Sequence, residues 1–192
     1  MKFVAFDGSA STDGSTAILP GRALTELETD GIETELLWLE KNPLTGCCAC
    51  GQCAHKRDDR CSRPPDDGLR RCVGKIIAAD GIIIGSPAYS ANCSPATQVL
   101  MQRADHARRA SGTPLTGKVG AAVISGGGAG AVRALDRINH WFRINEMIVV
   151  ESGSGIVGAG RDAGAVDHDE AGLATMGTLG RAIARMLNLT TA

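Results

Sequence analysis

Five of the seven cysteines lie within fifteen consecutive residues, from Cys47 to Cys61. Four of these cysteines follow the spacing C-x2-C-x2-C-x7-C. Three thiolates separated by two-residue gaps can surround one corner of a compact inorganic cluster, and a fourth thiolate farther along the chain can complete the coordination. The spacing therefore predicts a [4Fe–4S] cluster. Its four ligands would be Cys47, Cys50, Cys53 and Cys61.

Two other interpretations of these cysteines stay open. Bacterial ferredoxins share the C-x2-C-x2-C core, whereas a structural zinc site more often uses two separated pairs of ligands. This sequence has no second pair. A disulfide framework is typical of small secreted domains that lack a core. The alternatives to the cluster are therefore zinc, and redox-active or disulfide-bonded cysteines without a metal.

The composition of the chain limits its class and its partners. The chain has 192 residues, 43% of them hydrophobic, so we expect a single domain over residues 1–192 with the cysteine-rich loop at about 43–66. Twenty basic and twenty-one acidic residues nearly cancel, so we expect neither nucleic acid nor a membrane as a partner. The apolar runs are too short to cross a bilayer, and the first residues lead directly into a strand. We therefore expect a cytoplasmic protein whose cysteines stay reduced.

Short apolar segments alternate along the chain with segments of helical periodicity. Five of each predict an α/β protein, a flavodoxin-like three-layer sandwich. Its five-stranded parallel sheet would have the order 2-1-3-4-5 and helices on both faces, and a long glycine-rich connection would follow the fifth strand. The expected strands cover residues 2–6, 33–39, 81–85, 117–124 and 147–150, and the expected helices cover residues 16–30, 66–79, 95–108, 131–143 and 169–187.

Three loops would meet beyond the carboxyl ends of the strands, where such sheets bind ligands. Residues 7–16 are rich in hydroxyls and precede a helix, which suits a phosphate. This loop lacks the lysine of a P-loop, and an ordinary serine-capped turn is the alternative. Residues 86–94 offer a proline and an aromatic ring to a flat ligand, and the glycines of 125–130 let the main chain approach it closely. Together the three loops favour flavin mononucleotide (FMN).

The order of these segments resembles the flavodoxin-fold NAD(P)H-dependent FMN reductases, and among them the iron–sulfur flavoproteins. The similar pieces extend over nearly the whole chain. The C-x2-C-x2-C-x7-C spacing falls within the range of the iron–sulfur flavoproteins and is the most specific part of the resemblance. In chain order, the similar pieces are G-S-A-S-T-D-G-S-T, the cysteine cluster, A-D-G-I-I-I-G-S-P-A-Y, G-K-V-G-A-A-V-I-S-G-G-G and D-E-A-G-L-A-T-M-G-T-L-G.

The resemblance implies an FMN site, a cluster close to a flavin, and a homodimer or homotetramer with flavins near the subunit interfaces. It also implies NAD(P)H or a small redox carrier such as ferredoxin as the electron partner. The sequence departs from the family where Ala10 and Ser11 replace the usual Pro-Arg, which removes one phosphate partner, and where Ser15 replaces the usual Asn. The implied FMN residues are Ser9, Ser11, Gly14, Ser15 and Thr16 at the phosphate, Ser86, Pro87, Ala88, Tyr89 and Ser90 against the ring system, and Ser125, Gly126 and Gly127 on its other side.

These observations lead to one main functional hypothesis and two alternatives. The main hypothesis is a flavin-dependent oxidoreductase that transfers electrons between FMN and a [4Fe–4S] cluster, because a flavin exchanges two electrons and a cluster one at a time. The first alternative is an NAD(P)H-dependent FMN or quinone reductase whose cysteines bind no cluster. The second is a non-enzymatic protein, either a flavodoxin-like electron carrier or a cysteine redox sensor.

Overall fold

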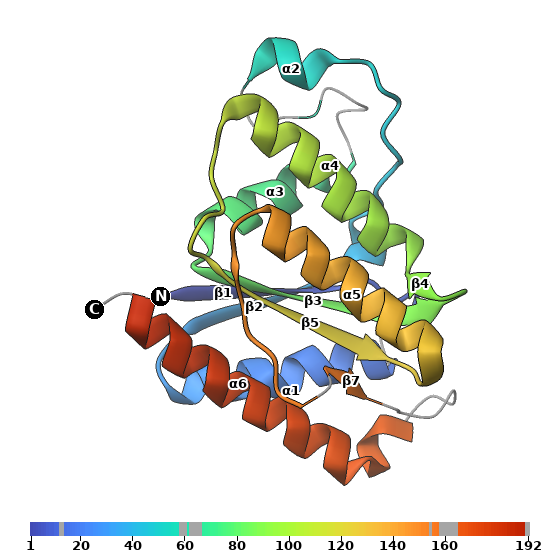
Figure 1. Ribbon diagram of the computed structural model, residues 1–192, viewed down its shortest axis with the longest axis vertical. Helices are drawn as coiled ribbons and strands as arrows, with labels where there is room; N and C mark the ends of the chain where they lie inside the picture. The colour runs from blue at the N-terminus through green and yellow to red at the C-terminus, as the bar shows by residue number, and fades with distance from the viewer. Residues whose placement is uncertain (12–13, 58–60, 62–66, 154, 158–164, 191–192) are drawn as a thin grey trace.

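The computed structural model describes residues 1–11, 14–57, 61, 67–153, 155–157 and 165–190, and its centre is a mainly parallel sheet (Figure 1). The order β2-β1-β3-β5-β6 confirms the predicted flavodoxin-like arrangement of five parallel strands. In the described part of the chain the sheet has seven strands where five were predicted, because two short segments join it. The strands are β1 (Lys2–Asp7), β2 (Glu33–Trp38), β3 (Gly81–Tyr89), β4 (Asn92–Cys93), β5 (Val119–Ser125), β6 (Ile148–Val149) and β7 (Ile156–Val157).

The two additional strands lie next to the carboxyl ends of β3 and β5. β4 folds back antiparallel on β3 through a tight turn at Ser90 and Ala91, whose φ angles are 48° and 61°. Beside β5, the predicted strand at 147–150 is reduced to two residues, which pair with the first half of β5. β7, from the glycine-rich connection, pairs with its last two residues. The outer position of the sheet is therefore filled by two separate fragments, which periodicity alone could not show.

Helices cover both faces of the sheet and complete the three layers (Figure 1). α1 and α6 pack on one face, α3, α4 and α5 pack on the other, and the short helix α2 packs on α4. The five predicted helices are present, and α2 was not predicted. The helices are α1 (Ser15–Thr29), α2 (Gln52–Lys56), α3 (Leu69–Ala78), α4 (Pro95–Ser111), α5 (Gly128–Ile144) and α6 (Glu170–Thr190), with 3-10 turns at Leu39–Lys41 and Ala165–His168.

The expected start of the third helix is only partly described. Asp67 Oδ1 accepts a hydrogen bond from the backbone N–H of Leu69 at 3.3 Å, as expected for a residue that caps a helix. Asp66, where the sequence predicts that this helix begins, lies outside the described residues. None of the described helices is long and apolar enough to span a membrane.

Burial on both faces explains why β3 is an uninterrupted apolar run. Ile82, Ile83 and Ile84 are all fully buried. Successive side chains of a strand point to opposite faces, so Ile82 and Ile84 pack with α3, α4 and α5, while Ile83 packs with α1 and α6. This strand lies at the centre of the sheet between β1 and β5, and its carboxyl end carries the second candidate FMN loop.

The first residue of β3 has room only for a glycine. A Cβ atom built on Gly81 would lie 2.3 Å from Cε2 of Phe3 and 2.6 Å from the carbonyl oxygen of Val119. Gly74, on the exposed face of α3, has nothing within 4 Å of the same position. The two glycines therefore offer a matched pair of substitutions.

We expect Gly81→Ala to lower the free energy of unfolding by about 1–3 kcal/mol, because the added methyl group overpacks the centre of the sheet. Gly74→Ala should raise it by about 0.5–1 kcal/mol, because alanine is the better helix former. Urea unfolding followed by circular dichroism measures both values. Equal effects of the two substitutions would contradict the packing at Gly81.

Candidate functional site

The three predicted FMN loops meet at the carboxyl edge of the sheet. Thr16 Oγ1 and Ser125 Oγ are 2.7 Å apart, so the first and third loops are joined by a hydrogen bond. The second and third loops also touch, since a Cβ atom built on Gly126 would lie 3.3 Å from Cβ of Ala88. Pro87 is the register partner of Ser125 across β3 and β5. The structure therefore brings together residues that lie more than a hundred positions apart in sequence.

The first loop leads into α1, whose amino terminus is open to an anion. Gly14 is the N-cap residue, and no side chain in the described part of the chain accepts a hydrogen bond from the first turn. The N-terminal turn of α4, in contrast, is capped by Ser94, whose Oγ accepts from the N–H of Thr97 at 3.2 Å. Unsatisfied N–H groups and the helix dipole favour a phosphate at such a position. This end of α1 therefore fits the phosphate of FMN.

Asp7, which sequence reasoning missed, lies buried beneath this loop. It is 1% exposed, and its carboxylate accepts from the backbone N–H of Ser9 at 2.8 Å and from the Ser9 hydroxyl at 2.9 Å. Burial raises the pKa of Asp7, and the hydrogen bonds from Ser9 lower it by less. Ser9 Oγ also lies 2.8 Å from the carbonyl oxygen of Ser11. The hydroxyl of Ser9 thus lies between the Asp7 carboxyl group and the main chain of Ser11, and it links the buried end of β1 to the loop.

The second loop divides into a buried and an exposed part. Ser86 is fully buried, and its Oγ accepts from the N–H of Ser94 at 2.8 Å, so it attaches this loop to the start of α4. Tyr89, by contrast, is 49% exposed, and Ser90 is exposed beside it. Cys93 is buried among core residues, and burial raises the pKa of its thiol to about 11. Among the predicted FMN residues of this loop, Tyr89 and Ser90 are thus the exposed ones.

Trp38, at the carboxyl end of β2, is a second residue that sequence reasoning missed. Its indole Nε1 donates to the carbonyl oxygen of Ser9 at 2.8 Å. Nζ of Lys41 lies 5.2 Å from the centroid of its ring, a cation–π distance. The sequence presented Trp38 only as part of an apolar strand. Its hydrogen bond holds the phosphate loop against β2, just before the chain enters the cysteine-rich loop.

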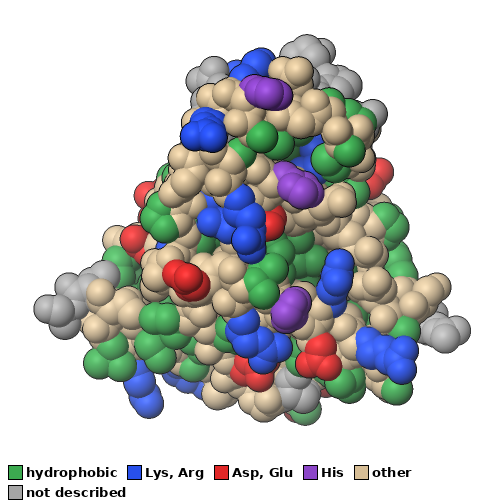
Figure 2. All heavy atoms as spheres, turned by 45° about the horizontal axis from the view of Figure 1, so that its top comes forward, with side chains coloured by type: hydrophobic (Ala, Val, Ile, Leu, Met, Phe, Trp, Pro, Cys, Tyr) green, Lys and Arg blue, Asp and Glu red, His purple; other side chains and the backbone are tan. Residues whose placement is uncertain are grey.

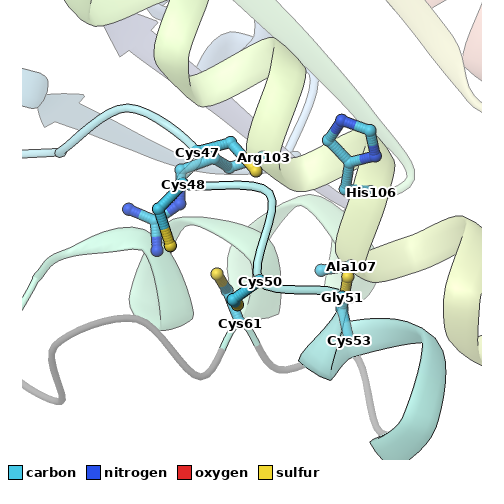
Figure 3. A pocket seen from close by; sticks show the side chains of 9 residues that line it. All are labelled: Cys47, Cys48, Cys50, Gly51, Cys53, Cys61, Arg103, His106 and Ala107. Carbon is cyan, nitrogen blue, oxygen red and sulfur yellow. The ribbon is translucent and has the colours of Figure 1, made fainter.

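The predicted cluster ligands line one pocket (Figure 3). Cys47, Cys50, Cys53 and Cys61 share it with Cys48 and Gly51, and α4 supplies Arg103, His106 and Ala107. All seven cysteines are described, and none of them forms a disulfide. In the described part of the chain, no three His, Cys, Asp or Glu side chains lie close enough together to hold a metal ion. The assignment of four of these thiols as cluster ligands stays a prediction.

The local backbone of the pocket also suits thiolate ligands. Ala49 and Gly51 adopt left-handed conformations, with φ angles of 53° and 69°. The N–H of Ala49 donates to Sγ of Cys47 at 3.4 Å. Turns of this kind direct backbone N–H groups toward an enclosed anion and recur at iron–sulfur sites. The five thiols, the N–H to sulfur hydrogen bond and the neighbouring Arg103 together fit a thiolate-bound cluster.

Within one chain the cysteine pocket does not lie beside the FMN loops. Ser94, at the start of α4, contacts the second FMN loop, whereas Arg103 and Ala107 of the same helix line the cysteine pocket. At 1.5 Å per residue, these positions are roughly 13–20 Å apart along the helix axis. The cysteine loop packs against α4 instead of following the strand ends, because its own short helix α2 docks there.

We expect Asp7→Asn to flatten the dependence of stability on pH. Because the pKa of Asp7 is raised in the folded state, protonated Asp7 stabilises the fold at a pH below the pKa of an unfolded aspartate, about 3.9. This part of the free energy of unfolding is lost as the pH rises through the pKa of Asp7 in the folded protein. Asparagine does not ionise, so the free energy of unfolding of the variant should fall less than that of the wild type between pH 4 and neutral pH. Thermal unfolding from pH 4 to pH 8 measures the slope. Asp136→Asn, on the exposed face of α5, is the control, and an equal slope for Asp7→Asn and wild type would contradict the assignment.

Comparisons with known proteins agree with this geometry. The model of the NADPH-dependent FMN reductase family matches residues 1–162. An iron–sulfur flavoprotein of Methanocaldococcus jannaschii is 34% identical over 196 residues, covering 98% of each chain. The crystal structure of RosB with bound 8-demethyl-8-formylriboflavin-5'-phosphate aligns with a TM-score of 0.73 at 15% identity, over 100% of this chain and 80% of that one. A flavodoxin from the domain Archaea aligns with a TM-score of 0.62 at 14% identity, over 98% and 99%.

The two solved structures show the fold alone, because their sequence identities are low. The family match, which spans most of the chain, carries the flavin-dependent redox function. The iron–sulfur flavoprotein of Methanocaldococcus jannaschii, which is similar over 98% of its length, indicates the group within this family. The chain therefore belongs to the NADPH-dependent FMN reductase family and, within it, to the iron–sulfur flavoproteins, and it is a flavin-dependent oxidoreductase.

Proposed function

We propose that this oxidoreductase transfers electrons between FMN, held at the carboxyl edge of the sheet, and a [4Fe–4S] cluster held by Cys47, Cys50, Cys53 and Cys61. The observation that carries the proposal is the shared pocket, in which all four predicted ligands lie against one side of α4. The relative from Methanocaldococcus jannaschii is itself named an iron–sulfur flavoprotein. When bound, FMN supplies two-electron chemistry and the cluster one-electron chemistry, so the protein would join partners of both kinds.

The residues of the first site would bind and orient the flavin. The open amino terminus of α1 would hold the phosphate, with Thr16 and the N–H groups that follow Gly14 as its donors. The exposed Tyr89 would lie against the ring system, and Gly126, at a φ of 138°, would bring the main chain close to it. The buried carboxyl group of Asp7 would hold this loop in place through its hydrogen bonds from Ser9.

The distance between the two sites supports transfer between subunits. The cysteine pocket of one chain would face the flavin of a neighbouring chain in a homodimer or homotetramer. Figure 2 shows the face formed by α4 and α5, where histidine and basic side chains surround a hollow with a hydrophobic floor. Ile144 of α5, which lines this hollow, is 45% exposed and gives the face further apolar area. Apolar surface of this kind suits contact with another subunit.

The electron partner would be NAD(P)H or a small acidic carrier such as ferredoxin. Arg57 lines a surface hollow beside α2, next to the cysteine loop. Lys56 precedes Arg57 at the end of α2, and both residues are exposed. Positive charge around a redox site guides negatively charged partners to it and increases the rate of association. A docked carrier would then be close to the thiol pocket.

We expect anaerobically purified protein to show flavin absorbance together with iron and sulfide in equal amounts. Cys50→Ala should lose the iron and keep FMN, because it removes one ligand from a site separate from the flavin. Cys48→Ala is the matched control, since this thiol lies in the same pocket but outside the spacing, and it should keep the iron. Iron assays and visible spectra measure both. Full iron content in Cys50→Ala would refute the ligand assignment.

The second candidate is an NAD(P)H-dependent FMN or quinone reductase without a cluster. The description of the matching family model favours it. Flavin bands without iron in the wild-type protein, combined with NAD(P)H oxidation in the presence of a quinone, would establish this candidate and exclude the cluster.

The proposed transfer between subunits requires a stable oligomer. Light scattering coupled to size-exclusion chromatography should give a mass of at least twice the chain mass of 19.8 kDa. A monomer that still reduces its cluster through FMN would contradict the transfer between subunits.

A further inference from the structure

Arg103 is the one cation buried beneath the thiol pocket in the described part of the chain. Its side chain projects from α4 and is 1% exposed, and it lines the pocket with all five loop cysteines (Figure 3). Arginine is rarely buried so completely unless its charge is paired. The environment of this guanidinium therefore indicates what the pocket is built to hold.

In the part of the chain that the structure describes, oxygen acceptors reach only one edge of the guanidinium. Nη1 donates to the carbonyl oxygen of Thr45 at 2.8 Å and forms an ion pair with Asp67. Nε and Nη2 are buried and have no hydrogen-bond partner among the described residues. The guanidinium of arginine stays protonated at any pH at which proteins are studied. The side chain is therefore charged, and its Nε and Nη2 donors are available to a ligand in the pocket.

The unsatisfied donors call for a negatively charged acceptor in the pocket. Buried donors without partners are costly, and native proteins rarely leave them unpaired. The side chains that share the pocket with Arg103 are thiols, with His106 and Ala107. Thiolates bound to a metal cluster are negatively charged acceptors, and hydrogen bonds to cluster sulfurs together with local charge set the reduction potential.

We propose that Arg103 is a positioning residue of the cysteine site, which donates from Nε and Nη2 to the cluster thiolates and raises the reduction potential of the cluster. The inference rests on the proposed function, because it requires the cluster. One-electron reduction adds one negative charge to the site and forms or breaks no bond. A buried guanidinium stabilises that added charge. Asp67 opposes this effect, since its carboxylate pairs with the opposite edge of the same guanidinium.

The chain offers variants that change the potential in opposite directions. Arg103→Met removes the charge and the donors at similar length, and Arg103→Lys keeps the charge without the planar fork. Asp67→Asn leaves Arg103 in place and removes the opposing charge. Arg109→Met is the matched control, because Arg109 lies on the same helix but is 52% exposed and pairs with Asp105 at 2.7 Å.

The test is a potentiometric titration of the iron-loaded variants under anaerobic conditions, in which the FMN potential is followed as an internal reference. Arg103→Met should lower the ratio of reduced to oxidised cluster at a fixed ambient potential by about tenfold, which is about 59 mV for one electron. Arg103→Lys should lower it by less, and Asp67→Asn should raise it. Arg109→Met should leave it unchanged, and the FMN potential should stay constant in all four variants.

Iron-loaded Arg103→Met with an unchanged cluster potential would overturn the inference, as would equal shifts in Arg103→Met and Arg109→Met. If Arg103→Met loses its iron or does not fold, Asp67→Asn decides the matter, and an unchanged or lower potential in that variant would overturn the inference. Wild-type protein without iron and sulfide would overturn the proposed function and this inference together. Iron-loaded variants of unaltered potential would overturn the inference alone.

Discussion

The backbone hydrogen bonds that hold β1, β3 and β5 in parallel register determine the position of the whole candidate FMN site. Asp7, the last residue of β1, is paired with Gly85, and Gly85 with Val123, so the three strands run toward the same edge of the sheet. Their loops leave the sheet at one edge, where the hydroxyls of Thr16 and Ser125 come within 2.7 Å of each other. A slip of one residue would turn every side chain of a strand to the other face, and the loops would no longer meet.

The cysteine site depends on a different constraint, the burial of a charged pair between α4 and the chain around it. Arg103 of α4 reaches Thr45 at the start of the cysteine loop and Asp67 just before α3. These two contacts fasten both ends of the loop to one helix. Removal of one partner from a buried pair leaves an uncompensated charge, which is strongly destabilising. The same guanidinium therefore has a structural role as well as the electrostatic role that we propose.

Both sites use α4, at opposite ends. Ser94 caps its first turn and binds the second FMN loop, and the thiol pocket lies two to three turns farther along. A helix of this length is a rigid spacer of fixed rise. Direct contact between the flavin and the cluster of one chain would require a large rearrangement, whereas a second subunit can bring the two together without one. Oligomerisation would then be part of the redox function.

The sequence alone determined the fold class and the order of the five parallel strands, because these depend on local periodicity. The spacing of the thiols predicts a cluster, and that assignment stays a prediction. The tertiary structure decided the rest. The division of the outer strand into β6 and β7, the burial of Asp7 beneath the first loop, and the hydrogen bond from Trp38 to Ser9 all arise from contacts between distant segments. The role of Arg103 was equally hidden, since its position in a helical pattern gives no sign that it meets residues 58 positions away. Local patterns fix which elements form, but only packing decides which buried charges face each other.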